Sequence, residues 1–223
     1  MAFHYSPKIG TDGLALYLDA ANTKSYVSGS TTWSDLSRSG NNGTLVNGPT
    51  FNSESGGSLF FDGTNDYVNG SCTLDGQNIT INLWCYPTTS GVFRTPITNQ
   101  ISDGVMIGYA IQQRNDSTFW MTIGTWGVSG DRVINIPYSI NQWINLSMTY
   151  NGTTITAYRN GILFGTTPST RIFTSGNLII GAGHSGLIEY FSGNISQTSI
   201  YNRVLTPQEI LQNYNATKGR FGL

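Results

Sequence analysis

The fold is decided by residues 143–165, which read WINLSMTYNGTTITAYRNGILFG. Apolar and polar residues alternate from Ile144 to Met148, and the dipeptides Asn151-Gly152 and Asn160-Gly161 follow at turn positions. Alternation with a period of two, interrupted by Asn-Gly, is the strongest short-range signal for β-hairpins. The segment therefore predicts three short strands, apolar on one face, and the rest of the chain must supply an opposing layer.

Turn signals recur along the remaining sequence at intervals of about ten residues, which is typical of β-sandwiches. Further strands are predicted at 13–18, at the end of 31–45, within 58–68 on both sides of Asp62-Gly63, at 79–86, twice within 95–113, and at 118–124, 133–137, 177–181 and 193–201. No long helical period precedes the C-terminus. We expect an all-β fold in which two antiparallel sheets form a jelly-roll sandwich.

One short helix is predicted near the C-terminus. Thr206 suits the N-cap, Pro207 the first helical position, and Glu209 completes a capping box three residues after the cap. We expect an irregular N-terminal arm over residues 1–12, one β-sandwich over 13–215, and a tail over 216–223 that returns to loop.

The composition narrows the classes of partner. The chain has 223 residues, of which 38% are hydrophobic and 10% charged, and its net charge is −1. A near-neutral chain without basic runs gives no electrostatic reason to bind nucleic acid or anionic lipid. No apolar run approaches the roughly 20 residues of a membrane span, so we expect no membrane insertion. The start, MAFHYSPKIGTDG, lacks the pattern of a secretory signal.

The chain contains two cysteines, Cys72 and Cys85. Cys85 is in phase with Ile79, Ile81 and Leu83, so we expect it to face the core as a small apolar residue. A disulfide to Cys72 remains an alternative, since two cysteines alone do not define a disulfide framework.

Six segments resemble parts of one known family, and they occur along the chain in the same order as in that family. They are LYLDAAN (16–22), TTWSDLSRSGNNGTL (31–45), LFFDGTNDYV (59–68), ITINLWCYP (79–87), QWINLSMTYNGTTITAYRNG (142–161) and FSGNISQTSIYNRVLTPQEI (191–210). Together they resemble the laminin-G-like branch of the concanavalin A-like lectin/glucanase sandwiches. The resemblance implies a two-sheet jelly roll in which one sheet is usually concave and bears the ligand surface. Residues 8–26 and 213–223 are similar to domains of tailed-phage and other virion structural proteins.

Catalysis has little support in the sequence. Glycosidases need two carboxylates about 5 to 10 Å apart, whereas Glu54, Glu189 and Glu209 are the only glutamates and do not cluster. His4 and His184 are the only histidines, so a Ser-His-Asp arrangement would need His184 and an unmarked nucleophile. We expect a protein that is not an enzyme.

Calcium is the cofactor that the sequence suggests, because hard cations take several oxygen ligands from acidic and glycine-rich turns. Two loops qualify, one with Asp35 and Asn41 and the other with Asp62 and Asp66. Relatives in the resembling family often bind calcium through acidic loop residues. The alternative is that Asp35 and Asp62 hold turns by accepting hydrogen bonds from backbone amides. The acidic residues of the family's final motif are missing from Gly193–Gln197, which weakens a role there.

Glycan binding is the third chemistry considered, since sugar sites pair an aromatic plane with hydrogen-bonding side chains. Trp120 and Trp126 lie near Asn115, Asp116 and Asp131 in a less family-like segment, and these five residues are the predicted ligand site. Packing is the alternative for Trp126. Packing is expected for the other three tryptophans, Trp33, Trp84 and Trp143, with Trp84 on the face of its strand opposite the apolar row.

We therefore predict a non-enzymatic virion protein: a capsid decoration, fibre or tail-associated lectin-like module. Its partners would be other virion proteins, host-surface glycans, or both, and its location the virion. Attachment to a capsid would favour a trimer or another symmetric homo-oligomer. The alternatives are a secreted or cell-surface carbohydrate-binding module and, with less support, a glycoside hydrolase.

Overall fold

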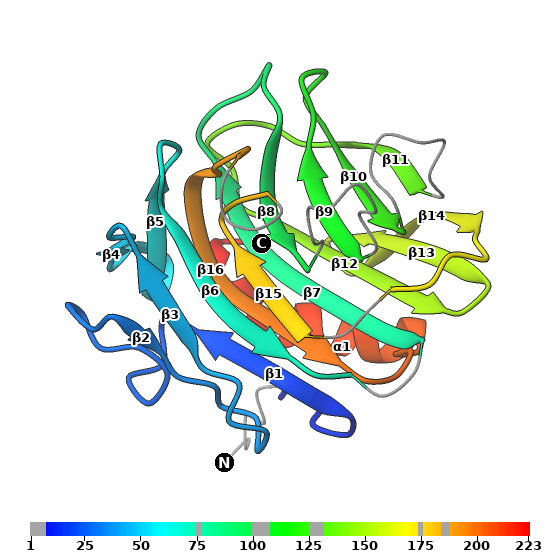
Figure 1. Ribbon diagram of the computed structural model, residues 1–223, viewed down its shortest axis with the longest axis horizontal. Coiled ribbons are helices and arrows are strands. Elements are labelled where there is room, and N and C mark those ends of the chain that lie inside the picture. Colours follow the sequence, from blue (N-terminus) through cyan, green and yellow to red (C-terminus); the bar gives the residue numbers. More distant parts are fainter. Residues whose placement is uncertain (1–7, 75–76, 100–107, 125–131, 174–175, 184–187) are drawn as a thin grey trace, which may run out of the picture.

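The structure is a computed structural model, and it describes residues 8–74, 77–99, 108–124, 132–173, 176–183 and 188–223. Within these ranges two eight-stranded sheets pack face to face, and one α-helix lies outside them (Figure 1). All strand pairs are antiparallel. The predicted all-β sandwich with one short C-terminal helix is confirmed.

The two sheets are named A and B, and their strands are given in spatial order. Sheet A contains β14 (Ile162–Pro168), β13 (Thr154–Arg159), β12 (Ile144–Asn151), β7 (Asn78–Pro87), β16 (Ser192–Tyr201), β5 (Ser58–Asp62) and β4 (Thr50–Asn52), with β1 (Leu14–Asp19) also paired to β16. Sheet B contains β11 (Arg132–Pro137), β10 (Thr118–Ile123), β9 (Tyr109–Gln113), β8 (Arg94–Thr98), β15 (Gly176–Ile180), β6 (Tyr67–Cys72), β3 (Gly43–Val46) and β2 (Thr32–Trp33). The helical segments are η1 (Glu54–Gly56), α1 (Pro207–Thr217) and η3 (Lys218–Phe221).

The predicted three-stranded meander is confirmed as β12, β13 and β14. Asn160 and Gly161 form the two-residue turn between β13 and β14, with φ values of 52° and 75°. Two positive φ values in succession suit the twist of a tight hairpin, which explains the Asn-Gly sequence. A Cβ atom on Gly161 would lie 2.9 Å from the Cβ atom of Tyr214 in α1, so this turn also packs against the helix.

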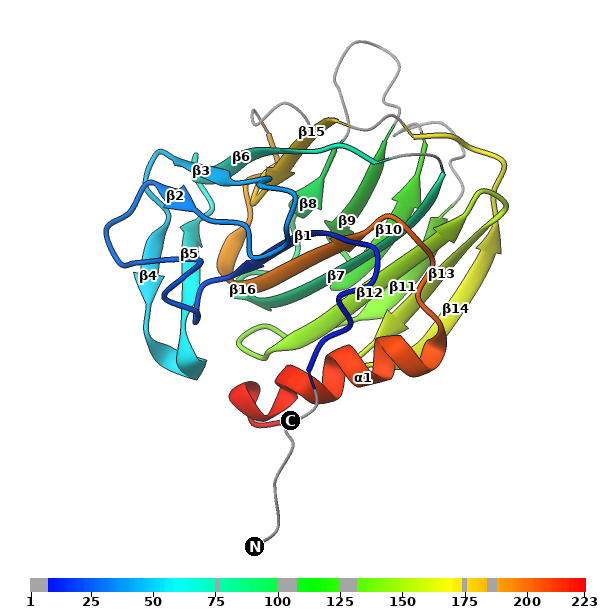
Figure 2. The same cartoon turned by 90° about the horizontal axis from the view of Figure 1, so that it is seen from below.

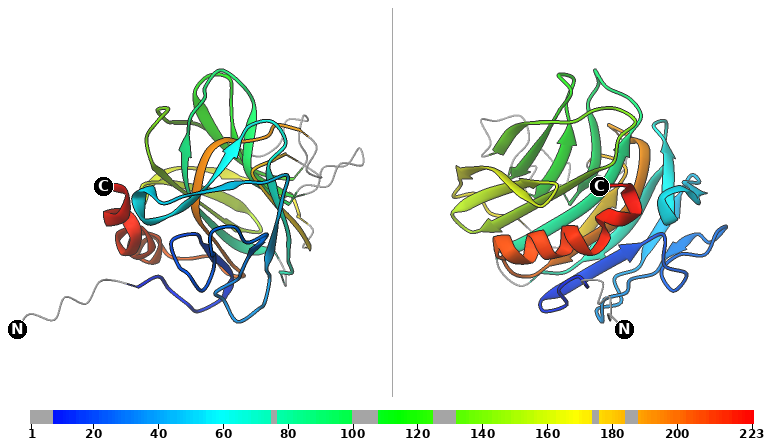
Figure 3. Two further views of the ribbon diagram at one scale, coloured as in Figure 1. Left: turned by 90° about the vertical axis from the view of Figure 1, so that its left-hand side faces the viewer. Right: turned by 180° about the vertical axis from the view of Figure 1, so that it is seen from behind.

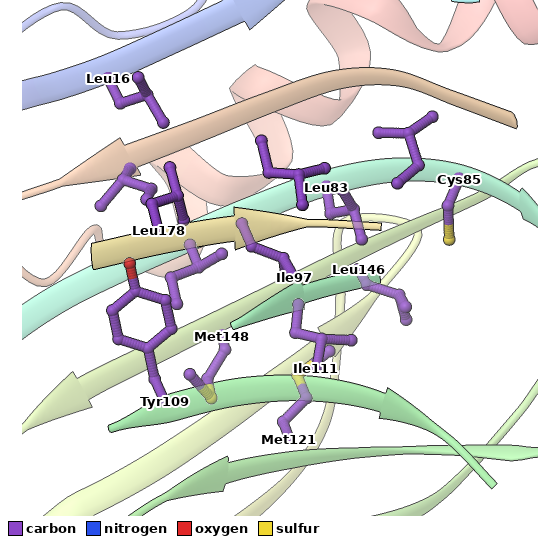
Figure 4. Close-up of a cluster of buried hydrophobic side chains, with 14 of the residues drawn as sticks. Leu16, Leu83, Cys85, Ile97, Tyr109, Ile111, Met121, Leu146, Met148 and Leu178 are labelled. Carbon is purple, nitrogen blue, oxygen red and sulfur yellow. The ribbon is translucent and has the colours of Figure 1, made fainter. Parts of the chain in front are cut away.

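The core lies between the sheets and is filled by alternate side chains of their strands. Leu83 and Leu146 of sheet A face Ile111 and Met121 of sheet B, and all four are fully buried (Figure 4). Burying a side chain of this size stabilises a fold by about 1.5–3 kcal/mol. The alternation read from residues 79–86 and 144–148 thus identified one half of this core.

Both cysteines are free and buried, which excludes a disulfide between them in this structure. Cys85 lies in the core, as expected, and Cys72 contributes to the same cluster. Burial raises the pKa of the Cys72 thiol to about 12 and raises that of Cys85 as well. The thiols are therefore protonated and act as small apolar groups.

The outer face of sheet A is covered by the C-terminal segment. Figure 2 shows α1 running alongside this sheet, and the right-hand view of Figure 3 shows it lying across the strands. Trp84 points to this face, as predicted, and is 1% exposed. Its Nε1–H donates to Thr217 Oγ1 over 2.9 Å, and its ring stacks on Phe221 with centroids 4.1 Å apart.

The loop expected over residues 216–223 is wrong. α1 extends to Thr217, and η3 continues to Phe221. Gly219 and Gly222 suggest a loop locally, but packing determines the outcome, because Phe221 is only 8% exposed under the aromatic rings of sheet A. Arg220 adds an ion pair to Asp19 at 2.9 Å, which ties this segment to β1.

The start of α1 is confirmed in detail. Thr206 is the N-cap and Pro207 follows it; the Thr206 side chain accepts from the Glu209 backbone, and the Glu209 side chain accepts from the Thr206 backbone. Arg203 pairs with Glu209 at 2.6 Å. In the ranges that the structure describes, no helix is long and apolar enough to cross a membrane.

Candidate functional site

A cationic cluster surrounds Trp120 on the outer face of sheet B. Trp120 alternates along β10 with Phe119 and Met121, which are buried in the core, so its indole lies on the opposite face. β10 lies between β9 and β11. Side chains from these neighbouring strands can therefore approach the indole from two sides.

Two arginines make that approach. The Cζ atom of Arg114, just after β9, lies 3.8 Å from the Trp120 ring centroid, and the Cζ atom of Arg132, at the start of β11, lies 4.1 Å from it. Contacts of this kind contribute about 0.5–2 kcal/mol each. The two guanidinium groups reach the indole from either side of β10, so two cations meet at one aromatic ring. The ring is consequently engaged by positive charge, which competes with stacking on a sugar.

Neither guanidinium group is directly paired in the part of the chain that the structure describes, although the carboxylates of Glu189 and Asp116 act on Arg114 from a distance. Among the described residues neither group forms an ion pair or a hydrogen bond. Guanidinium groups usually bind carboxylate or phosphate through paired hydrogen bonds. Two stacked arginines whose donors are unused therefore form an arrangement that suits an anionic ligand.

An aromatic ring and several polar side chains lie near Arg114. Phe93 contacts the guanidinium of Arg114, with the Cζ atom 4.2 Å from the ring centroid. Gln112, two residues before Arg114 and on the same face, is 3% exposed, and its Oε1 has no hydrogen-bond partner in the described part of the chain. The Glu189 carboxylate accepts from Thr95 Oγ1 over 2.6 Å and from Gln112 Nε2 over 3.4 Å.

The electrostatics of Arg114 reflect its burial and nearby charges of both signs. Burial is the main reason why the pKa of its guanidinium is lowered, and the positive charge of Arg132 lowers it further. The carboxylates of Glu189 and Asp116 act in the opposite direction. A bound anion would offset the repulsion between the two arginines, since opposite charges within a few ångströms favour the charged forms.

The predicted ligand residues are distributed as follows. Asn115 and Asp116 are exposed in the turn between β9 and β10, next to Arg114. Asp116 holds this turn, because its Oδ1 accepts from the backbone N–H of Thr118 over 3.1 Å. Trp120 lies in the cluster, whereas Trp126 and Asp131 lie outside the described residues.

The two arginines were not predicted. In the hairpin of 109–113 with 118–123, Gln112 is the register partner of Trp120. Arg114, two residues after Gln112, shares its face of the sheet, so this pairing would have placed Arg114 beside Trp120. Arg132 could not be found in this way. Its contact with Trp120 depends on where the chain returns after residue 124, and no local pattern encodes that return.

The first predicted calcium loop is closed by hydrogen bonds. Asp35 accepts from the backbone N–H groups of Tyr17 and Ser37, each over 2.8 Å, and of Asn41 over 2.9 Å. The structure thus brings Asp35 and Asn41 together, with the carboxylate engaged in holding the turn. This geometry supports the turn alternative and leaves calcium binding there a prediction.

The second predicted calcium loop has a similar arrangement. Asp62 Oδ1 accepts from the backbone N–H of Thr64 over 2.7 Å, and Asp66 Oδ2 accepts from the backbone N–H of Asp62 over 3.1 Å. No group of three His, Cys, Asp or Glu side chains that could hold a metal gathers within the described ranges. Calcium at Asp62 and Asp66 likewise stays a prediction.

The fold and the outer face of sheet B define a lectin-like antiparallel sandwich. The chain belongs to the concanavalin A-like lectin/glucanase superfamily, whose family model matches residues 61–211. The resemblance to the laminin-G-like branch of this superfamily is confirmed. No curated protein matches the chain in sequence.

Solved structures with the same fold include binding domains of clostridial toxins. The botulinum neurotoxin serotype D binding domain has a TM-score of 0.72 at 16% identity, over 92% of this chain and 52% of the other. The serotype D ligand binding domain in complex with N-acetylneuraminic acid gives 0.70 at 16%, over 92% and 51%. The binding domain of Paraclostridial Mosquitocidal Protein 1 gives 0.67 at 16%, over 92% and 52%. The chain thus spans about half the length of these structures, and the likeness shows the fold.

Proposed function

We propose that this protein is a non-enzymatic, lectin-like module that binds acidic glycans through Arg114 and Arg132. The observation that carries the proposal is the pair of unpaired guanidinium groups stacked on Trp120. Stacking fixes the planar groups before a ligand arrives, so less entropy is lost on binding. Each charge-assisted hydrogen bond to a carboxylate contributes about 1.5–3 kcal/mol.

The ligand class follows from the charge of the site. One structure of the same fold was solved with N-acetylneuraminic acid, a carboxylated sugar, and this supports an acidic glycan as the ligand class. Its sequence is only 16% identical and about twice as long, so the likeness does not place its ligand on this chain.

The non-enzymatic part of the proposal is supported by the positions of the glutamates. Glu209 caps α1 and pairs with Arg203, and Glu189 accepts from Thr95 beside the cationic cluster. Glu54 lies in η1, beside a different sheet. The three glutamates thus have separate surroundings and do not form with one another the facing pair of carboxylates that glycoside hydrolysis needs.

A pair of matched ligands tests the proposal. Polygalacturonate carries a carboxylate on every residue, and fully methyl-esterified polygalacturonate is the same chain without charge. We expect binding to the acid and not to the ester. Because exposed charges are screened over about 8 Å at physiological ionic strength, affinity should also fall steeply with added salt.

Three variants assign that binding to the site. Arg132→Gln and Arg114→Gln should each weaken binding of the acid about 10- to 100-fold, the equivalent of losing one charge-assisted contact. Arg159→Gln removes the same charge from an exposed position on β13 and should leave binding unchanged. Equal losses in all three variants would refute the assignment, because they would indicate a response to net charge alone.

For the biological setting we propose a virion, in which the chain would be a capsid decoration, fibre or tail-associated component. This proposal rests on the resemblance read from the sequence of residues 8–26 and 213–223 alone. Mass spectrometry of purified particles should detect the chain in stoichiometric copies. Its absence from particles would favour the alternative, a secreted or cell-surface carbohydrate-binding module.

A further inference from the structure

A small hollow of about 260 Å³ lies on the outer face of sheet A, on the opposite side of the sandwich from Trp120. It is lined by Asn52, Glu54, Ser55, Tyr86, Trp143 and Asn194. Tyr86 and Asn194 are register partners on β7 and β16 and form the floor. Asn52 comes from β4, and η1 and the residue before β12 supply the walls.

Two aromatic rings are held in fixed positions at this hollow. The ring centroids of Tyr86 and Trp143 lie 5.4 Å apart with an interplanar angle of 57°. Trp143 donates its Nε1–H to Ser55 Oγ over 3.0 Å and packs on Phe221 with ring centroids 4.6 Å apart. These contacts leave the indole little freedom, so its surface toward the hollow is pre-organised.

A buried amide is oriented into the same place. Asn194 is 7% exposed, and its Oδ1 accepts from Ser58 Oγ over 3.2 Å and from Asn52 Nδ2 over 3.4 Å. Both contacts are made by the amide oxygen, and Nδ2 donates no hydrogen bond within the described residues. Asn194 lines the hollow and Nδ2 is not among the fully enclosed polar atoms, so this donor is accessible to a ligand that offers an oxygen.

Two further polar groups at the hollow are unused. In the described part of the structure the Glu54 carboxylate and the Tyr86 hydroxyl form no hydrogen bond, and Glu54 forms no ion pair. The hollow therefore combines two ring surfaces, one carboxylate acceptor and one fixed amide donor. Saccharide sites are built from such an apolar surface with a few convergent polar groups.

We propose that this hollow is a second binding site, which takes one ring of a neutral saccharide. A sugar hydroxyl can donate to the Glu54 carboxylate while a neighbouring oxygen accepts from Asn194 Nδ2. The C–H face of the ring would pack against Tyr86 and Trp143. The volume is slightly below the roughly 300–1,000 Å³ of sites for drug-sized ligands, which suits a single ring or a chain end.

Other ligand classes fit the same groups less well. An acidic sugar would face the Glu54 carboxylate with no lysine or arginine in the lining to offset the repulsion. A quaternary ammonium would suit the rings and the carboxylate, but it offers no acceptor to Asn194. The site thus differs in specificity from the cationic cluster, and the inference does not depend on acidic-glycan binding.

The test uses ¹⁹F NMR of the whole chain labelled with 5-fluorotryptophan. The chain has five tryptophans, so five resonances are expected, and Trp143→Phe identifies that of Trp143. The probes are the methyl glycosides of glucose, galactose, mannose and N-acetylglucosamine, with choline and galacturonate as competitors of other classes. We expect one or more neutral glycosides to shift the Trp143 resonance, with a dissociation constant of the order of 1 mM.

Variants separate this site from the proposed acidic-glycan site. Glu54→Gln should weaken the neutral glycoside about tenfold, because a neutral amide replaces a charged acceptor. Tyr86→Phe should weaken it a few-fold, and Asp12→Asn, which alters an exposed carboxylate elsewhere, should have no effect. Arg132→Gln should also leave it unchanged, so each site can fail without the other.

Three results would overturn the inference. They are a Trp143 resonance that no neutral glycoside shifts, a shift that choline or galacturonate produces instead, and equal losses in Glu54→Gln and Asp12→Asn. The Tm of each variant is measured as a control. Only variants whose Tm equals that of the parent chain are compared, so that a loss of binding reflects the site and not unfolding.

Discussion

The hydrogen bond between Trp84 and Thr217 makes a sharp prediction about how α1 is held on sheet A. The bond is 2.9 Å long and both residues are buried. Thr217→Val keeps the shape of the side chain and its branched Cβ, but removes the acceptor. Trp84 Nε1–H would then be a buried donor without a partner, which costs about 1–3 kcal/mol. Thr217 also donates to Asn213 O within the helix, and that loss is minor because the carbonyl belongs to the helical ladder.

The expected destabilisation of about 2 kcal/mol corresponds to a fall in Tm of about 4–8 °C for a domain of this size. Urea unfolding followed by tryptophan fluorescence measures the free energy directly. The decisive measurement is a double-mutant cycle with Trp84→Phe, which removes the donor. In the Trp84→Phe background, Thr217→Val should cost less than about 0.5 kcal/mol, since no donor is then left unpaired. An equal cost in both backgrounds would refute the hydrogen bond as the cause.

Three further predictions concern titration, thiol chemistry and metal binding. Hydrogen bonds from Arg203, and then from the N-cap backbone, lower the pKa of Glu209 to about 2. The stability that these bonds provide is complete above pH about 4.5 and is lost as the pH falls toward 2. The Tm difference between the parent and Glu209→Gln should therefore shrink over that range, and a constant difference would contradict the prediction. Cys72 and Cys85 should resist a thiol reagent such as DTNB in the native state and both react after unfolding, because burial raises the pKa of each thiol; rapid native reaction of either would contradict their burial. If calcium binds as predicted, millimolar CaCl₂ should raise the Tm above that in EDTA, and Asp35→Asn or Asp62→Asn should abolish the rise at its loop; an unchanged Tm would leave both carboxylates with their turn-holding role alone.

The parts of the fold that the sequence predicts are those encoded by neighbouring residues. Asn160-Gly161 specifies a hairpin turn because both residues tolerate positive φ. Thr206 and Glu209 specify the start of α1 because a capping box is complete within four residues. The tail from Ala216 was wrongly expected to be loop, since its order depends on Phe221 reaching Trp84 across a distance of 137 positions in the chain.

The candidate sites follow the same division. Trp120 was found from the sequence because an aromatic residue near Asn and Asp suggests a ligand, but that pattern does not show that Arg114 and Arg132 stack on its ring. In the sequence, Asn194 lies in a segment that lacks the acidic residues of the family's final motif, so no ligand role was expected there. Its unused donor becomes visible only when Ser58 and Asn52 are seen to occupy its oxygen.

The two outer faces of the sandwich use aromatic rings in opposite ways, and this difference determines the specificity proposed for each. On sheet B, arginines on either side of Trp120 convert the indole into a support for positive charge. On sheet A, α1 and η3 cover the ring of Trp84, which stacks on Phe221. Trp143 packs on the same Phe221 and lies at the edge of the covered area. There the neighbours are a carboxylate and amides rather than cations. What lies against each ring, rather than the presence of tryptophan itself, therefore favours an anion on one face and a neutral hydroxylated ligand on the other.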